Sequence, residues 1–70
     1  MNVYIKIKEI PEAIYLENVM LIKVLNSRTG KENDIIDFKD FRFYANLSYN
    51  FIGKQIFSVW GQNIEYVLFG

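Results

Sequence analysis

The 70-residue sequence contains no cysteine and no histidine. Disulfide bonds are therefore excluded, and a structural zinc site lacks its usual ligands. The same absences remove the Ser-His and Cys-His pairs of nucleophilic catalysis, which leaves only carboxylates, lysines, tyrosines and serines for chemistry. We therefore expect a protein that is not an enzyme and that uses neither a cofactor nor a metal.

An excess of charge of one sign is also missing, because eight Lys and Arg residues balance eight Asp and Glu residues. This balance argues against a general binder of nucleic acid or of anionic membranes.

The longest apolar run, Val19 to Leu25, contains Lys23 and falls well short of the roughly 20 residues of a membrane span. The N-terminus alternates like a strand and does not resemble a signal peptide, so we expect a cytoplasmic protein.

Glycine and proline are scarce, with four copies and one copy respectively. The glycines lie far apart, so the sequence has no glycine-rich phosphate loop, and no linker or repeat marks a domain boundary. We expect a single domain over residues 1–70. A core of this size supplies only about 3–5 kcal/mol of stability, and a net charge near zero favours association.

Aromatic residues are plentiful, at 17% of the chain, and several segments alternate apolar and polar residues as strands do. Asn2 to Lys8 places Val3, Ile5 and Ile7 on one face of a predicted strand. Phe41 to Asn50 alternates in the same way and predicts a second, longer strand.

The segments between these two are less uniform. Val19 to Asn26 is rich in branched residues and predicts a strand, and Ser27 to Gly30 is a turn leading into a return strand that starts at Lys31. Glu9 to Glu17 suits either a short helix or, as we favour, a turn followed by a strand. Asn33 to Asp40 fits a short helix as well as it fits a strand.

The C-terminal residues 55–70 predict a β-hairpin that is apolar on both faces. The strands Gln55 to Trp60 and Ile64 to Phe69 flank Gly61-Gln62-Asn63, a loop with the residues that tight hairpins use. Since an antiparallel sheet with one wet side should alternate cleanly, this hairpin needs cover from two directions. One face carries Ile56, Ser58, Trp60, Ile64, Tyr66 and Leu68, and the other carries Gln55, Phe57, Val59, Glu65, Val67 and Phe69.

These elements predict an all-β or β-dominated α+β fold. We expect a small antiparallel sheet or barrel of five to six short strands, either with or without one short helix. This is the size range of SH3-like or OB-like modules. That comparison is architectural and carries no function.

The surplus of apolar faces favours a protein-binding module that forms a homodimer or docks on a protein partner. A curled barrel that hides every face is the alternative. Large aromatic residues dominate the energy of dry interfaces, so the predicted contact residues on the hairpin are Phe57, Trp60, Tyr66 and Phe69.

A nucleic-acid-binding module is the second hypothesis. Single-strand binders display aromatic and basic residues together on a sheet, and the polar faces of the two best strands supply this mixture. The residues concerned are Tyr4, Lys6, Lys8, Arg42 and Tyr44.

The spacing of Asp34, Asp37 and Asp40 would align three carboxylates if the segment were helical, but it differs from that of a calcium loop, and helix capping explains it equally well.

Composition adds a hypothesis about origin. Ile, Asn, Lys, Tyr and Phe, which have mostly A- and T-rich codons, are abundant, as in a small accessory or inhibitory protein of an AT-rich bacterium, phage or mobile element.

Overall fold

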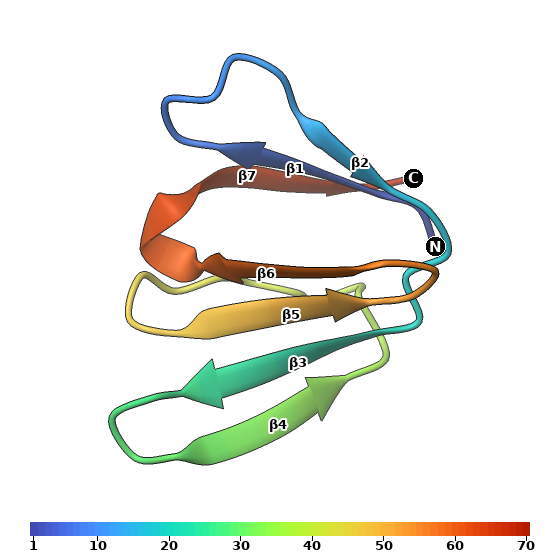
Figure 1. Cartoon of the computed structure of the whole chain (residues 1–70). Helices are drawn as coiled ribbons and strands as arrows, with labels where there is room; N and C mark the ends of the chain where they lie inside the picture. The colour runs from blue at the N-terminus through green and yellow to red at the C-terminus, as the bar shows by residue number, and fades with distance from the viewer.

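The structure, a computed structural model, describes all 70 residues and contains seven strands and one 3-10 turn. Two antiparallel sheets form, with strand orders β2-β1-β7 (sheet A) and β4-β3-β5-β6 (sheet B), and they do not close into a barrel (Figure 1). The predicted small, β-dominated antiparallel fold is confirmed, with seven strands in place of five or six. The elements are β1 Val3–Ile7, β2 Ile14–Leu16, β3 Leu21–Asn26, β4 Lys31–Ile35, β5 Ser48–Ile52, β6 Ile56–Trp60, η1 Gly61–Asn63 and β7 Ile64–Phe69.

The N-terminal half follows the sequence pattern closely. In β1 the apolar residues Val3, Ile5 and Ile7 are buried, and the strand lies at the centre of sheet A. The turn-then-strand interpretation of residues 9–17 is confirmed by β2. The β3–β4 hairpin is also confirmed, and Gly30 takes the positive φ of 75° that its turn requires.

The short helix considered for Asn33 to Asp40 does not form. Residues 33–35 belong to β4 and pair with β3, and residues 36–40 are irregular. Two helical turns are too short to be stable without tertiary packing, whereas pairing along β3 satisfies the backbone directly. The three-residue η1 is the only helical element, and it is far too short to span a membrane.

The long strand predicted from Phe41 to Asn50 is wrong over its first seven residues, because residues 36–47 form an irregular loop and β5 begins at Ser48. The loop packs its phenylalanine rings onto the core. The Phe41 ring meets Tyr49 and Phe51 edge-on, with centroids 5.6 and 6.1 Å away, and Phe38 stacks on Phe69 at 5.2 Å. Alternating apolar residues therefore mark a buried face here without strand pairing.

The C-terminal hairpin prediction is also wrong. β6 pairs with β5 in sheet B, whereas β7 pairs with β1 in sheet A, and η1 carries the chain from one sheet to the other (Figure 1). The reason lies at Gly61, where the N–H donates to the Leu47 carbonyl at 2.7 Å and a Cβ would overlap the Tyr44 carbonyl oxygen. The loop thus holds the chain in a tight turn that directs β7 away from β6.

The core lies between the two sheets and is almost entirely aliphatic and aromatic. Eleven hydrophobic residues are buried, and no charged residue is buried among them. Tyr49 contributes the one polar atom of note, because its hydroxyl accepts the Tyr44 N–H at 2.7 Å and so ties the loop to β5. Each sheet uses one face for this core and leaves its other face outward.

Replacing Gly61 with Ala is expected to destabilise the fold by about 1–3 kcal/mol or more, because the added methyl group must displace the Tyr44 backbone. Urea denaturation of the purified protein measures the loss as a lower midpoint. Gly70→Ala is the matched control, since nothing lies within 4 Å of a Cβ there. Equal midpoints for the two variants would contradict the close approach.

Burial raises the pKa of the Tyr49 phenol above its ordinary value, and nearby Tyr44 adds to the rise, while the hydrogen bond from the Tyr44 N–H opposes it. A raised pKa in the folded state means that stability is intact below a pH of about 10 and is lost as the pH rises above it. We expect Tyr49→Phe to weaken this alkaline loss while costing about 1 kcal/mol at neutral pH, where the Tyr44 N–H loses its acceptor. Denaturation at a series of pH values measures both effects, and identical alkaline slopes for both proteins would rule the assignment out.

Candidate protein-binding surfaces

The four aromatic residues predicted to form one contact lie in three different places. Phe57 and Phe69 are half-buried and pack against the core. Trp60 and Tyr66 point outward, 46% and 41% exposed, but from different sheets. Because the hairpin does not form, these residues do not make up a single surface, and a binding role for each of them remains a prediction.

The outer face of sheet A carries a cluster that we call the tyrosine surface, made of Tyr4, Tyr15, Tyr66, Leu68 and Lys6. Tyr4 on the central strand lies opposite Tyr15 of β2 on one side and Leu68 of β7 on the other. The rings of Tyr4 and Tyr15 are 4.8 Å apart, and Lys6 lies opposite Tyr66. Strand pairing therefore brings together residues from both ends of the chain.

The charge at the centre of the tyrosine surface is already satisfied. The Lys6 side chain is only 16% exposed, its Nζ donates to the Ile7 carbonyl at 2.9 Å, and the Glu65 carboxylate lies 3.7 Å away. Desolvation by burial raises the pKa of the Tyr15 phenol, and the nearby Glu17 carboxylate and Tyr4 add to the rise. The Tyr15 phenol is therefore neutral at physiological pH, and the surface presents hydroxyl groups among apolar side chains.

Sequence reasoning found three members of this surface but did not group them. Tyr4 and Lys6 were assigned to the nucleic-acid hypothesis and Tyr66 to the hairpin contact. Tyr15 and Leu68 were missed. The usable signal was Tyr15 between the apolar Ile14 and Leu16, since alternation in a short strand turns the middle residue outward.

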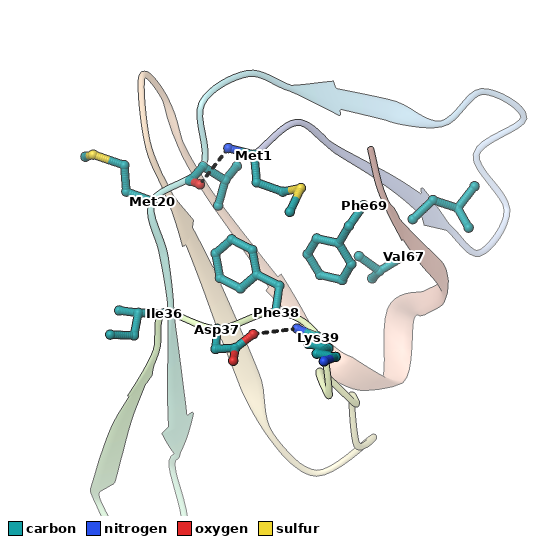
Figure 2. A pocket seen from close by; sticks show the side chains of 10 residues that line it. Met1, Met20, Ile36, Asp37, Phe38, Lys39, Val67 and Phe69 are labelled. Carbon is teal, nitrogen blue, oxygen red and sulfur yellow. Dashed lines mark hydrogen bonds between the residues drawn. The ribbon is translucent and has the colours of Figure 1, made fainter.

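An apolar groove of about 800 Å³ opens between the start of the 36–47 loop, β7 and the N-terminus (Figure 2). The stacked rings of Phe38 and Phe69 lie in it, and the side chain of Met1 extends toward them. Met20 and Ile36 project from its margin and are highly exposed. The lining comes from four separate segments, so no local pattern indicated it: Met1, Val19, Met20, Ile36, Asp37, Phe38, Lys39, Val67, Leu68 and Phe69.

The residues of the nucleic-acid hypothesis divide between two elements. Tyr4 and Lys6 lie on the tyrosine surface, and Lys8 follows β1 and is exposed. Arg42 and Tyr44 lie instead in the irregular loop, where they share a shallow hollow with Asp37 and Asp40. The predicted pair of basic strand faces is therefore absent, and acidic groups accompany the second half of the set.

The carboxylates of the 33–40 segment also separate when the helix is absent. Asp34 pairs with Lys23 across β3 and β4 at 3.3 Å, and Asp37 accepts the Lys39 N–H at 3.1 Å. No group of three or more Asp, Glu, His or Cys side chains gathers at one point.

The outer face of sheet B carries a row of polar side chains between two groups of apolar side chains. Its middle row is polar, with Lys23 bound to Asp34 and the Ser58 hydroxyl bound to the Asn50 side chain. Apolar residues lie on both sides of this row, and on the outermost strand they are Ile56 and Trp60. This face ends at β6, the last strand of the sheet.

Comparisons with models of protein families, with curated proteins and with solved structures gave no match.

Proposed function

We propose that this protein is a non-enzymatic protein-binding module and that the tyrosine surface is its contact with a protein partner. The observation that carries the proposal is the exposure of Tyr4, Tyr15, Tyr66 and Leu68, each between 41% and 56%, side by side on one sheet face. Apolar groups gathered in this way on a small domain mark interaction sites.

Several properties of this surface suit a protein partner. Tyrosine supplies a large contact area with little loss of side-chain entropy, and its hydroxyl group can bond to a partner's backbone. The side chains stand on paired strands, which hold them in place before binding. Polar residues such as Lys8, Glu17 and Glu65 are exposed around them, as in the rim of a typical interface.

The apolar groove extends the same surface around the edge of the sheet. Leu68 belongs to the tyrosine surface and also lines the groove, and its neighbours Val67 and Phe69 line the groove from the inner side of β7. A partner that passes over the β7 edge would therefore bury both regions together.

Changing Tyr4 and Tyr66 together to Thr is expected to abolish partner binding without unfolding the protein, because Thr suits strands and both sites face solvent. The measurement is capture from an extract of the source cell, followed by titration of the purified partner. Tyr44→Thr is the matched control, since Tyr44 is exposed in the loop, and it should bind like the unaltered protein. A partner held equally by all three proteins would refute a contact at the tyrosine surface.

Single-stranded nucleic acid is the second candidate, and the Tyr4–Tyr15 ring pair beside Lys6 and Lys8 is the observation that favours it. The ion pair of Lys6 with Glu65 and the neutral net charge weigh against it. If it holds, a labelled oligonucleotide binds in a salt-dependent manner and Lys8→Glu reduces the affinity. No binding at low salt would eliminate this candidate.

A further inference from the structure

β6 has a free edge that carries no protection against pairing. It is the last strand of sheet B, and its backbone forms hydrogen bonds to β5 alone. Along its other side a row of N–H and C=O groups is without a protein partner, which is the template on which another strand assembles. Its five residues, Ile56–Trp60, include no charge, proline or glycine.

The other three edge strands, β4, β2 and β7, each carry a feature that hinders pairing with another strand. The β4 edge contains Lys31, Glu32 and Asp34, and β2 is only three residues long. β7 contains Glu65 and an irregularity in its pairing with β1. Charges, short strands and bulges are the usual devices that prevent edge pairing, and β6 has none of them.

We propose that β6 pairs antiparallel with β6 of a second copy of this chain, about a two-fold axis at Ser58, and so joins two four-stranded sheets into one of eight strands. This contact lies on sheet B, apart from the tyrosine surface on sheet A. It does not depend on the proposed partner contact, although both are contacts between proteins. It extends the expected homodimer to a named strand and register.

The residue order of β6 is complementary to itself in this register. Ser58 lies opposite Ser58 of the second copy, Ile56 opposite its Trp60, and Phe57 opposite its Val59. Both of the larger pairs join an aromatic to a β-branched side chain, which is a favourable cross-strand combination. Ile56, 70% exposed in the single chain, and Trp60 would cover each other's apolar surface across the axis.

Electrostatics permit the same arrangement. A two-fold contact places the residue at the axis against its own copy, so a charge at position 58 would face a like charge. β6 carries none, and the net charge of the chain is zero. A second copy therefore meets no charge repulsion at this edge.

The test uses Ser58→Lys and Ser58→Glu, measured by light scattering coupled to size exclusion and by sedimentation. Ser58 is exposed and its hydroxyl bonds only to the Asn50 side chain, so either change costs the single chain one exposed hydrogen bond and leaves it folded. We expect the unaltered protein to be a dimer and each variant to dissociate about tenfold more readily or worse, because like charges meet at the axis. An equimolar mixture of the two variants should restore a one-to-one dimer. Ser27→Lys, the same change in the β3–β4 turn, is the control that stays dimeric.

A cysteine at the same position tests the register directly, because the chain has no cysteine of its own. Facing residues of an antiparallel pair have Cα atoms about 4.5–5.5 Å apart, within the range of a disulfide. Ser58→Cys should form a covalent dimer on mild oxidation, and Ser27→Cys should not.

Three outcomes would overturn the dimer: an unaltered protein that is a monomer at every concentration, a dimer that survives Ser58→Lys, or Ser58→Cys that does not cross-link above the Ser27→Cys control. Capture of the partner by the unaltered protein, lost on changing Tyr4 and Tyr66 together to Thr, would then show that the proposed function stands although the dimer fails.

Discussion

The contact between Gly61 and the end of the 36–47 loop governs how the two sheets are joined. The Gly61 N–H is bonded to the Leu47 carbonyl, and the Tyr44 backbone lies where a side chain would otherwise be. Because the chain turns in η1 at this contact, β6 completes one sheet and β7 completes the other. Strands β6 and β7 thus cover the core from opposite sides instead of pairing with each other.

This arrangement determines what is left at the surface. Each of the two strands places one row of side chains on the core, Phe57 and Val59 from β6 and Val67 and Phe69 from β7. The opposite rows face solvent in two separate regions. The β7 row joins Tyr4 and Tyr15 in the tyrosine surface, and the β6 row forms the margin of sheet B, so the proposed partner contact and the proposed dimer contact occupy different sheets.

Where alternation coincided with strand pairing, the sequence was a sound guide. Val3, Ile5 and Ile7 were expected inside and are buried, and the turn ending at Gly30 forms as its residues predict. From Phe41 to Tyr44 the same alternation predicts the buried side correctly but not the strand. The segment is held by packing of the Phe41 ring on Phe51 and Phe69, and not by backbone hydrogen bonds to a neighbouring strand. The candidate site was predicted only in pieces, since Tyr4, Tyr15 and Tyr66 meet through pairing of distant strands.

By itself the sequence determined the β-rich character of the domain and its lack of disulfide, thiol and imidazole chemistry, because these follow from composition and from the two-residue period of an extended chain. It also determined which side chains of β1 and β5 face inward. Only the tertiary structure decided that residues 55–70 divide between two sheets, and with that which aromatic residues share a surface. The reason is that the choice between a hairpin and a crossing depends on a contact with the loop near Tyr44, some seventeen residues earlier in the chain, which no local pattern records.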